Sequence, residues 1–455
     1  MLRRLHIENF KAWRDTGDIR LAPLTVFFGT NSSGKTSLQQ MLLLLQQTAQ
    51  SSDRQRVLHL GDSQSTIDLG TFSDVVHGHG EDTALKVALA WDSAQPLTIH
   101  DSRTNKKIEA NEFEFHATIR QPPRQPIQLE SMGYRIGPKL TVDFTRSSDV
   151  FELTMKGYEP VRNSGRRWPL PSPSRFYGFP DEAVSYFQNT GFLADLNLEL
   201  ERLFARLFYV GPLREYPKRL YLWSGEHPEH VGKTGSRAIE ALLAGKDRYY
   251  NFAARQRKQT LEEVVARWLQ QMGLIAEFAV RPIAENRKEY EVVVHSAKGG
   301  SEVKLTDVGF GVSQVLPVIV ECFYVPTNSI VLFEQPEIHL HPRVQADLAD
   351  LFIEALEARE GGHPRNLQLL VESHSEHFLR RLQRRIAERR IAAESVALYF
   401  CEEGPEGSVI RHLDLDDFGR ITNWPKDFFG DIAGDTAAQI RGGLLHVGRD
   451  GAKGG

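Results

Sequence analysis

The sequence predicts an α/β fold with a mixed β-sheet that is assembled from both ends of the chain. Near the N-terminus, residues 24–47 pass from an apolar strand pattern through a Gly/Ser-rich turn into a helix pattern. In the last third, apolar strands alternate with helices, which is typical of parallel-sheet units. Between these parts, residues 84–155 carry runs of alternating apolar and polar residues, which predict a largely antiparallel insertion.

Strands are predicted at 2–10 and 24–29, at the runs ALKVALAW, FEFHATIR, LTVDF and FELTMKGY, at AEFAVRPI and EYEVVVHS, and at the apolar runs IVLF and LQLLV. Helices are predicted after the Gly/Ser-rich turn and at 181–208, 236–272 and 344–358, and the last strand leads into another. Residues 396–412 predict a strand, a tight turn and a second strand.

Composition and charge exclude several classes of protein. The chain has 455 residues, of which 41% are hydrophobic and 25% charged, as in ordinary soluble proteins. A net charge of −4 excludes a histone-like binder, so any DNA-binding surface must be local. The two cysteines, Cys322 and Cys401, are too few for a disulfide framework or a zinc cluster. With no signal-peptide pattern and no apolar run long enough to span a membrane, we expect a cytoplasmic protein without a membrane partner.

The Gly/Ser-rich turn has the full pattern of a phosphate-binding loop, Gly-Thr-Asn-Ser-Ser-Gly-Lys-Thr. Its glycines allow successive N–H groups to point at phosphate oxygens, and the following helix N-terminus adds positive charge. Lys35 is expected to reach the β and γ phosphates, and the Thr36 hydroxyl to bind Mg²⁺. The predicted nucleotide site, for ATP with Mg²⁺, contains Gly29, Asn31, Ser32, Ser33, Gly34, Lys35, Thr36 and Ser37.

A metal-positioning acid is expected on a neighbouring strand end, because Mg²⁺ takes only one or two protein oxygens at such sites. Glu334, at the end of the apolar run IVLF, is the candidate, and it forms the predicted metal site together with Thr36. The next apolar strand ends in Glu-Ser-His-Ser, and His374 at its tip can donate a hydrogen bond to a γ phosphate.

A second anion site is predicted late in the chain. The stretch LTDVGFGVSQVLPVIV is Gly-rich and opens into an apolar helix, so that Gly311, Ser313 and Gln314 lie at a helix N-terminus. One nucleotide needs only one phosphate-binding loop. This second site therefore suggests that the chain caps the nucleotide of another subunit, and that it works as a homodimer or a higher oligomer.

Three further clusters have less specific interpretations. Glu337, His339 and His341 have alternate spacing but no second ligand cluster, so a dedicated metal site is the less favoured interpretation. The acids of LDLDDFG, at 413–419, follow the predicted hairpin and fit its solvated end. The basic run RRLQRRIAERR, at 380–390, could contact DNA phosphates, and it would suit an acidic partner protein equally well. A solvated helix face is the commoner interpretation of such a run.

This order of motifs resembles the ABC-class ATPase heads of the RecF, SMC and overcoming-lysogenization-defect proteins. EQPEIHLHP and ESHSEH are closer to a prokaryotic branch of AAA-family ATPases linked to DNA defence, which includes the ATPase subunit PtuA of the Septu anti-phage system. That branch also has YVGPLREYPKR, here 209–219, and a short C-terminal module with a Trp-Pro motif, here 421–431. The resemblance covers about 1–80 and 205–431 and leaves 81–204 without a counterpart.

The resemblance implies an ABC-type P-loop ATPase head with a large inserted β/α region and a small C-terminal module. Its N-terminal half would be 1–80, the inserted region 81–300 with the family-like stretch 205–219, its C-terminal half 301–400, and the C-terminal hairpin and Trp-Pro module 401–455. Glu334 would be the second acid, His374 the switch histidine, and 311–314 the signature that closes on the partner's γ phosphate. The signature reads Phe-Gly-Val-Ser-Gln and departs from the common Leu-Ser-Gly-Gly-Gln form. The glutamine that usually follows the first helix has no clear counterpart.

The main departure is Gln335, which stands where such ATPases usually have the glutamate that activates water. A glutamine can orient a water molecule but cannot take its proton, and a positioned general base typically contributes about 10²–10⁴-fold. Slow hydrolysis is therefore predicted, with Gln335, Glu337 and His374 as the catalytic candidates and Glu337 as the compensating base. A slow ATPase would persist as a closed, ATP-bound dimer, which suits a sensor or clamp.

Several functions remain open at this level. The first is a defence ATPase that controls a separate effector protein such as a nuclease, since the residues after His374 are too few for the nuclease domain fused to some relatives. A DNA-repair-type clamp that contacts DNA, a transporter-type module and a nucleotide-binding scaffold without turnover are the alternatives. The nearly 300 residues between Lys35 and Glu334 argue against the transporter.

Overall fold

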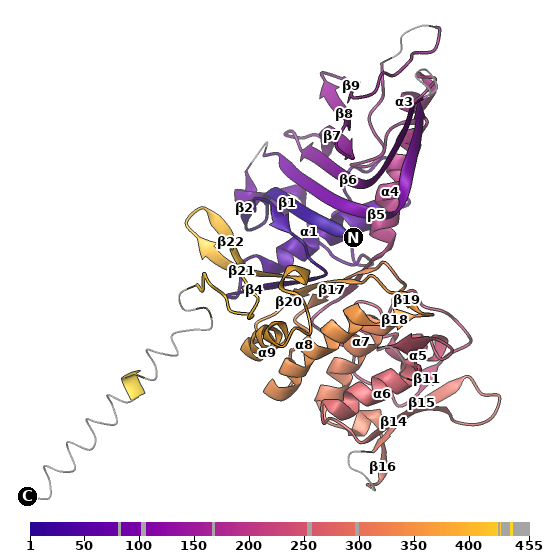
Figure 1. Ribbon diagram of the computed structural model, residues 1–455. Coiled ribbons are helices and arrows are strands. Elements are labelled where there is room, and N and C mark those ends of the chain that lie inside the picture. The colour runs from indigo at the N-terminus through magenta and orange to yellow at the C-terminus, as the bar shows by residue number, and fades with distance from the viewer. Residues whose placement is uncertain are drawn as a thin grey trace, which may run out of the picture.

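The computed structural model describes residues 1–80, 83–101, 106–165, 169–252, 257–295, 300–425, 428 and 437–439. Two lobes meet at a central sheet (Figure 1). One lobe is built around a large antiparallel sheet, and the other contains most of the helices and two smaller sheets. The predicted mixed α/β architecture is confirmed.

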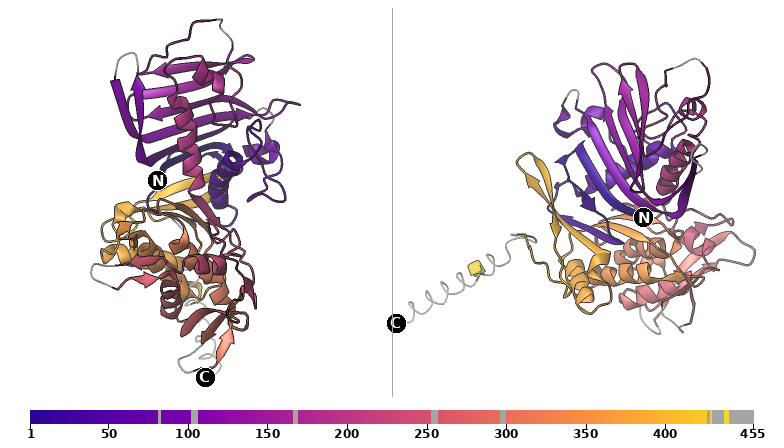
Figure 2. Two further views of the ribbon diagram at one scale, coloured as in Figure 1. Left: turned by 90° about the vertical axis from the view of Figure 1, so that its right-hand side faces the viewer. Right: turned by 45° about the horizontal axis from the view of Figure 1, so that its top comes forward.

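The antiparallel sheet has the order β2-β1-β5-β6-β7-β8-β9, and β3 pairs with β1. Its strands are β1 (Leu2–Phe10), β2 (Trp13–Asp15), β3 (Ile19–Arg20), β5 (Leu85–Asp101), β6 (Lys106–Arg120), β7 (Gln128–Ile136), β8 (Leu140–Ser147) and β9 (Val150–Lys156). The helix α4 (Phe192–Ala205) lies across one face of this sheet (Figure 2). The four runs that alternate in sequence form β5, β6, β8 and β9, as predicted, whereas β7 was missed because its sequence, QLESMGYRI, does not alternate regularly.

The central sheet has the order β10-β17-β20-β4-β21-β22. Its strands are β4 (Leu24–Gly29), β10 (Leu207–Val210), β17 (Ile330–Glu334), β20 (Gln368–Glu372), β21 (Val396–Gly404) and β22 (Gly407–Leu413). The first five strands in this order are parallel, and β22 forms an antiparallel hairpin with β21, as predicted. Because parallel strands share one carboxyl edge, the segments that follow β4, β17 and β20 meet there.

The central strands are buried on both faces, so their apolar runs are nearly continuous. In β17, Ile330 and Leu332 face the core that is shared with the antiparallel sheet, whereas Val331 and Phe333 face the core of the helical lobe. The period of two thus divides one strand between two cores. This arrangement fixes the register of β17, because a slip by one residue would exchange the two faces.

The remaining elements surround this sheet. The helices are α1 (Lys35–Gln50), α2 (Phe72–Val75), α3 (Asp181–Ser185), α5 (Ala238–Ala244), α6 (Leu261–Gln271), α7 (Phe310–Tyr324), α8 (Pro342–Glu357) and α9 (Glu376–Ala387), with single turns η1 (His77–His79), η2 (Leu305–Asp307) and η3 (Ala393–Ser395). The smaller strands are β11 (Tyr221–Leu222), β12 (Tyr249–Asn251), β13 (Gln259–Thr260), β14 (Glu277–Pro282), β15 (Glu289–His295), β16 (Glu302–Lys304), β18 (Arg359–Glu360) and β19 (His363–Pro364).

The two long helices predicted at 181–208 and 236–272 are wrong as single elements. The first is divided into α3 and α4, and its last residues begin β10, because the run LFYV pairs in parallel with β17. The second is divided into α5 and α6 by a turn that includes Gly245 and by the short strands β12 and β13. Gly273 ends α6 with φ +68°, a left-handed conformation that is typical of a glycine after a helix.

The predicted inserted region, 81–300, is not separate from the rest of the fold. Its strand β5 pairs with β1, and its strand β10 pairs with β17. The region therefore contributes strands to both large sheets, and it also contains the family-like stretch 205–219. The division of the chain at 81, 300 and 400 stays a prediction.

The C-terminal Trp-Pro motif is described only in part, since 426, 427 and 429–431 lie outside the described residues. Arg380 of α9 lies over the ring of Trp424, 5.2 Å from its centroid. Phe428 stacks on Phe400 of β21, with 4.7 Å between ring centroids. These contacts attach the motif to the central sheet and α9.

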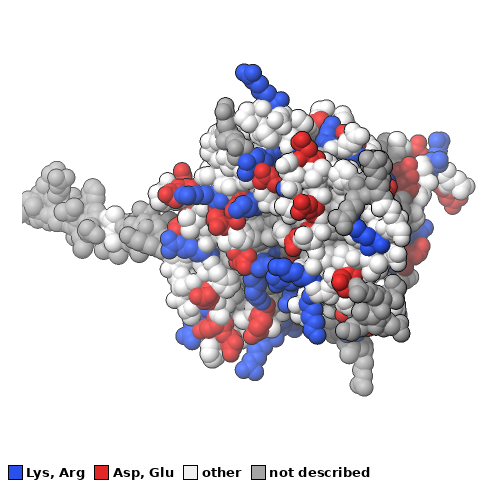
Figure 3. All heavy atoms as spheres, turned by 90° about the horizontal axis from the view of Figure 1, so that it is seen from above, with Lys and Arg blue, Asp and Glu red and all other residues white. Residues whose placement is uncertain are grey.

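Charge and hydropathy of the described residues add two observations. On the face shown in Figure 3, Lys and Arg side chains are interspersed with Asp and Glu side chains. None of the helices in the described part of the chain combines the length and the apolar character that a membrane crossing requires.

Candidate functional site

The phosphate-binding loop connects β4 to α1 at the carboxyl edge of the central sheet. Gly29, Ser32 and Gly34 all have positive φ, at +147°, +62° and +82°. A Cβ atom at Gly29 would lie 2.0 Å from the Cys401 carbonyl oxygen, so packing against β21 also requires glycine there. The Trp13 indole donates a hydrogen bond of 3.0 Å to the Gly34 carbonyl and supports the loop from β2.

The loop lines a cavity of about 280 Å³. Its lining residues are Lys11, Ala12, Asn31, Ser32, Ser33, Gly34, Lys35, Thr36, Ser37, Gln335, Glu372 and His374. The structure thus brings most of the predicted nucleotide-site residues together with two of the three catalytic candidates. Lys11 and Ala12, from the turn between β1 and β2, were not predicted, and their sequence gives no signal of this position.

Lys35 is buried and folded back onto its own loop. Its Nζ donates to the carbonyl oxygens of Thr30, at 2.6 Å, and Gly29, at 3.2 Å, and to the Ser33 hydroxyl, at 3.3 Å. Burial lowers the pKa of Lys35, and the nearby Glu372 partly opposes this effect. The loop therefore holds a cation at the position where phosphate oxygens are expected to compete for it.

Two carboxylates flank the Thr36 hydroxyl. This hydroxyl lies 2.9 Å from Glu372 Oε2 and 3.5 Å from Glu334 Oε1. Burial and, secondly, the neighbouring charge of Glu334 together raise the pKa of Glu372 to about 7. Sequence reasoning missed Glu372, although the available signal was the same as for Glu334: an acid that closes a buried apolar strand.

The three catalytic candidates occupy different positions. Gln335 has φ +44°, a strained value for a residue other than glycine. Its N–H donates to the Glu372 carbonyl at 3.0 Å, and its side-chain amide opposes the rise of the Glu372 pKa. Burial, followed by the charge of Lys35, lowers the pKa of His374 to about 4, so its imidazole is neutral at pH 7.

Glu337 lies behind this site and does not line the cavity. Its Oε1 accepts hydrogen bonds from the Ser373 hydroxyl, at 2.9 Å, and from the His374 backbone N–H, at 2.6 Å. Its Oε2 is buried and has no hydrogen-bond partner among the described residues. Glu337 therefore holds the tip of β20 in place, and a role as general base stays a prediction.

The stretch 209–219 contributes two residues that sequence reasoning did not assign. The Tyr209 hydroxyl donates to Glu334 Oε2 at 2.6 Å, and burial raises the pKa of this tyrosine. Arg214 follows β10 at the same edge of the sheet and is only 8% exposed. The only signal in the sequence is the family-like stretch itself.

The predicted signature residues lie at the start of α7. Gly311 is half-buried, whereas Ser313 and Gln314 are buried. The Ser313 hydroxyl donates to the Phe310 carbonyl of its own helix at 2.8 Å. In the single chain α7 is buried from Val312 onward and only its first turn reaches solvent. The role of these residues toward the nucleotide of another subunit stays a prediction.

The alternative metal cluster does not converge. Glu337 is occupied by the tip of β20, His339 packs against the Phe310 ring with 5.3 Å between centroids, and His341 caps α8 by accepting from the Arg343 N–H at 3.3 Å. Within the described residues, no group of three or more His, Cys, Asp and Glu side chains could hold a metal ion. The Thr36 and Glu334 pair, extended by Glu372, supplies the hard oxygen donors that Mg²⁺ prefers.

The acidic cluster after the hairpin has local partners. Asp414 pairs with His412 at 2.9 Å, and Asp416 pairs with Arg420 at 3.0 Å and also accepts backbone N–H groups. These contacts support the interpretation as a solvated hairpin end.

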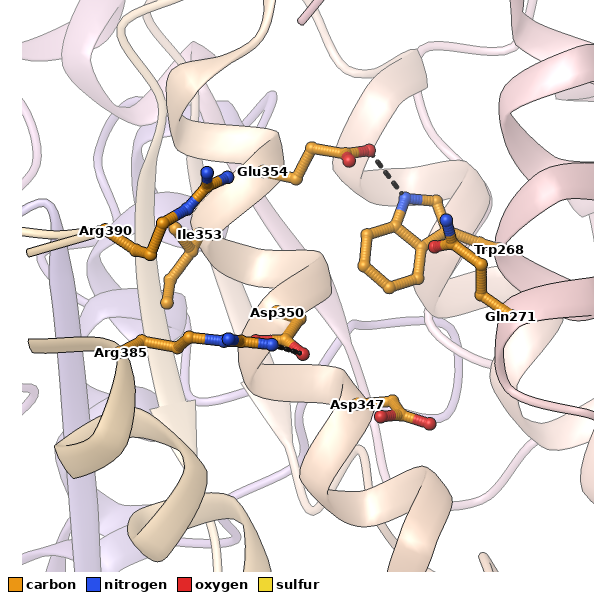
Figure 4. A pocket seen from close by; sticks show the side chains of 8 residues that line it. All are labelled: Trp268, Gln271, Asp347, Asp350, Ile353, Glu354, Arg385 and Arg390. Atoms are coloured by element: carbon orange, nitrogen blue, oxygen red, sulfur yellow. Dashed lines mark hydrogen bonds and ion pairs between the residues drawn. The ribbon is translucent and has the colours of Figure 1, made fainter. Parts of the chain in front are cut away.

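A larger cavity, of about 410 Å³, lies between α6, α8 and α9 (Figure 4). Arg385 crosses it to Asp350, with Nε 2.5 Å from Oδ1, and Arg381 pairs with Asp347 at 3.2 Å and with Asp350. On the opposite wall, the Trp268 indole donates to Glu354 at 2.8 Å. Because these arginines belong to the basic run 380–390, ion pairs between helices account for part of that run.

Comparison with protein families assigns most of the chain. Residues 24–380 match the family described as "AAA domain, putative AbiEii toxin, Type IV TA system". Residues 391–439 match a second family, described as "Protein of unknown function (DUF3696)". This second match covers the end of the chain where the Trp-Pro motif lies. A search of curated proteins returned no match.

Solved structures with a similar chain course include three SMC head domains. One is bound to the C-terminal winged-helix domain of ScpA (TM-score 0.41, 11% identity, 91% of this chain and 98% of that chain). Another is from Thermotoga maritima (0.39, 10%, 91% and 99%). A third carries an extended coiled coil, is bound to the C-terminal domain of ScpA, and derives from Pyrococcus furiosus (0.43, 11%, 91% and 96%).

The family match spans both halves of the site. It begins at the first residue of β4, includes the phosphate-binding loop and both acid-bearing strands, and ends within α9. The chain therefore belongs to this AAA-domain family.

Proposed function

We propose that this protein binds ATP with Mg²⁺ and hydrolyses it slowly. One observation carries the proposal: Lys35 and Thr36 of the phosphate-binding loop line one cavity with the strand-end acid Glu372. The Thr36 hydroxyl lies 2.9 Å from Glu372 and 3.5 Å from the second strand-end acid, Glu334. Gln335 and His374 also line this cavity, where a phosphate-transferring site needs groups that position water and contact the terminal phosphate.

In this proposal, the lysine binds phosphate and three oxygen-bearing side chains hold the metal ion. Lys35 exchanges its loop carbonyl partners for phosphate oxygens, which are stronger, charged acceptors. Thr36, Glu334 and Glu372 supply the metal-binding oxygens. When bound, Mg²⁺ supplies positive charge to the phosphate oxygens.

Gln335 and His374 act at the terminal phosphate in this proposal. The neutral His374 ring donates an N–H to a phosphate oxygen, and the Gln335 amide orients a water molecule. Neither group takes a proton from water at pH 7, since Gln335 has no basic site and the pKa of His374 is about 4. Turnover is therefore slow, and a scaffold with no turnover is the second candidate function.

We further propose that the protein acts as a homodimer or higher oligomer that closes on ATP. The first turn of α7 is its exposed end, and Leu213, Tyr216 and Phe310 are exposed by 74%, 75% and 39%. Tyr216 and Phe310 contact each other, with 5.6 Å between ring centroids. An exposed apolar group beside a helix N-terminus supports a contact with a second copy.

The biological role that fits best is regulation of a partner effector, such as a nuclease, in anti-phage defence in the cytoplasm. The resemblance of the sequence motifs to those of the Septu ATPase PtuA and the toxin–antitoxin description of the matched family support this role. A DNA-repair-type clamp remains the alternative. The ion pairs of Arg381 and Arg385 disfavour α9 as its DNA-binding surface.

The test is nucleotide binding and phosphate release by the purified protein. Lys35→Ala should abolish ATP binding, and Thr36→Ala should remove the Mg²⁺ dependence of binding and lower the release of phosphate. Lys86→Ala is the matched control, because Lys86 is a partly exposed lysine that pairs with Glu8 in the antiparallel sheet. ATP binding that survives Lys35→Ala unchanged would overturn the proposal.

A further inference from the structure

Arg214 is a buried cation that makes no hydrogen bond within the part of the chain that the structure describes. It is 8% exposed, and its Nε, Nη1 and Nη2 atoms make no hydrogen bond with any described residue. Burying a guanidinium without acceptors is costly, because its donors lose water and gain nothing in return. A residue with only a packing role would be less costly as an apolar side chain, so the charge requires another explanation.

Arg214 lies at the same end of the central sheet as the acids of the site, outside the set of residues that line the 280 Å³ cavity. It lies four residues beyond the end of β10, at the carboxyl edge of the central sheet, and β10 pairs with β17. Burial lowers its pKa to about 10, and this effect is opposed by the charges of Tyr209, Glu334 and Glu337. Arg214 is therefore within electrostatic reach of the acids at the metal-binding end of the site, without forming an ion pair with them.

The surroundings hold Arg214 in place. The N–H groups of Gly211 and Glu215, on either side of it, donate to the carbonyls of Lys233 and Thr234 at 2.8 and 2.9 Å. A Cβ atom at Gly235 would lie 2.5 Å from Pro317 of α7 and 3.9 Å from Arg214 Cδ. Gly235 is thus packed tightly against α7, and the aliphatic part of the Arg214 side chain lies beside it.

Glu337 provides a second unsatisfied group nearby. Its buried Oε2 has no partner among the described residues, and burial raises the pKa of this carboxyl, an effect that the charge of Arg214 partly opposes. Two opposite charges in a low-dielectric interior that do not touch imply that another polar group belongs between or beside them. The bound terminal phosphate and its water molecules are the anionic group that the proposed function brings to this end of the site.

We propose that Arg214 is a specificity-determining residue that makes the site favour a nucleoside triphosphate over a diphosphate. The γ phosphate, directly or through one water molecule, supplies the acceptor that the guanidinium lacks. The proposal rests on the proposed function, since it requires that ATP binds at the phosphate-binding loop. It also gives a role to a residue of the stretch 209–219, which the proposed roles of the phosphate-binding loop and the acids do not include.

The test compares the dissociation constants of fluorescent ADP and of a fluorescent, non-hydrolysable ATP analogue, each with Mg²⁺, for the full chain and its variants. Arg214→Gln should weaken the triphosphate analogue at least about tenfold and ADP by less than about twofold. The triphosphate affinity of Arg214→Lys should lie between those of the unmodified protein and Arg214→Gln, because lysine keeps the charge but loses the planar fork of the guanidinium. Arg219→Gln is the control, an exposed arginine of the same stretch that pairs with Asp307.

A stability measurement separates this role from a structural one. Without nucleotide, Arg214→Gln should raise the unfolding midpoint, because it removes a buried charge that has no partner. With the triphosphate analogue, the same variant should gain less stabilisation than the unmodified protein. An arginine that stabilises the fold through an ion pair would show a lower midpoint without nucleotide.

The outcomes distinguish this inference from the proposed function. If the unmodified protein binds neither nucleotide, the proposed function fails. If it binds both but does not prefer the triphosphate, or if Arg214→Gln and Arg214→Lys weaken both nucleotides in parallel, only the role of Arg214 is overturned. If Arg214→Gln does not fold, the Arg214→Lys comparison decides, since an unchanged ratio of the two constants contradicts the proposal.

Discussion

Glu334 and Glu372 are register partners at the ends of the adjacent parallel strands β17 and β20. The Thr36 hydroxyl of α1 contacts both carboxylates. Two acids in this arrangement repel each other, and the burial of Glu372 adds to its cost of ionisation. Without a metal ion, the protein therefore keeps a proton at this site up to nearly neutral pH.

The first prediction concerns the pH dependence of stability in the absence of Mg²⁺ and nucleotide. The pKa of Glu372 is about 7 in the folded protein, above its ordinary value of 4.5. The folded protein thus binds a proton that the unfolded chain releases, so this contribution is fully present below pH 4.5 and is lost as the pH rises through 7. The loss is on the order of 3 kcal/mol. Urea denaturation at several pH values between 4.5 and 8 measures it.

Glu372→Gln provides the comparison for this measurement. The variant should remove the part of the pH slope that lies between 4.5 and 7, since a glutamine does not titrate. Addition of Mg²⁺ at pH 7.5 should stabilise the unmodified protein more than the variant. Identical pH slopes for the two proteins would show that Glu372 is ionised throughout and that the acid pair is not strongly coupled.

The second prediction concerns Gln335. Gln335→Glu should increase steady-state phosphate release by about 10–10²-fold, because it supplies the proton acceptor that the site lacks. Lys35→Ala serves as the blank. The measurement is phosphate release with saturating ATP and Mg²⁺.

The opposite result would change the interpretation of the protein. Fast hydrolysis by the unmodified protein, with little change in Gln335→Glu, would mean that the base lies elsewhere. The slow-switch interpretation would then be wrong, and Glu337 would be the first residue to examine.

The third prediction separates a positioning role of Glu337 from a catalytic one. Glu337→Ala should lower the free energy of unfolding by about 2–4 kcal/mol, because it leaves the Ser373 hydroxyl and the His374 N–H without their acceptor. Glu337→Gln keeps an acceptor oxygen and should cost less. Urea denaturation gives both values.

Phosphate release by Glu337→Gln completes this comparison. A positioning role predicts nearly normal stability and a modest loss of activity. Normal stability with a loss of about 10² or more in phosphate release would identify Glu337 as the general base instead.

The fourth prediction concerns association through the exposed start of α7. Replacing Tyr216 and Phe310 by serine removes their mutual ring contact and the apolar area beside this helix end. ATP-dependent dimer formation, measured by light scattering after size-exclusion chromatography, should weaken at least about tenfold. Leu198→Ser is the matched control, because Leu198 is 45% exposed on α4, in the lobe of the antiparallel sheet.

ATP binding should persist in the Tyr216 and Phe310 variants, since neither residue lines the cavity of the phosphate-binding loop. An unchanged association constant would indicate that a second copy docks elsewhere, or that the protein is monomeric. Equal weakening by Leu198→Ser would show that the effect is a general one of surface hydrophobicity.

The sequence by itself determined the parts of this protein whose chemistry is local. Gly29 to Thr36 are contiguous, and their pattern between a strand and a helix predicts their geometry, because backbone angles and helix ends depend on neighbours in the chain. The hairpin at 396–412 and the alternating strands of the antiparallel sheet were predicted for the same reason. The family-like motifs further predicted that Glu334 and His374, which are distant in the sequence, belong to the same site as the phosphate-binding loop.

Only the tertiary structure decided which distant side chains meet. The pairing of β20 between β17 and β4 brings Glu372 to Thr36, and the pairing of β10 with β17 brings Tyr209 to Glu334. The tertiary structure also turned Glu337 toward the tip of β20, and it buried Arg214 away from every acceptor of the described residues. These outcomes depend on sheet order and on desolvation across the whole core, and neither is encoded in the pattern of any single segment.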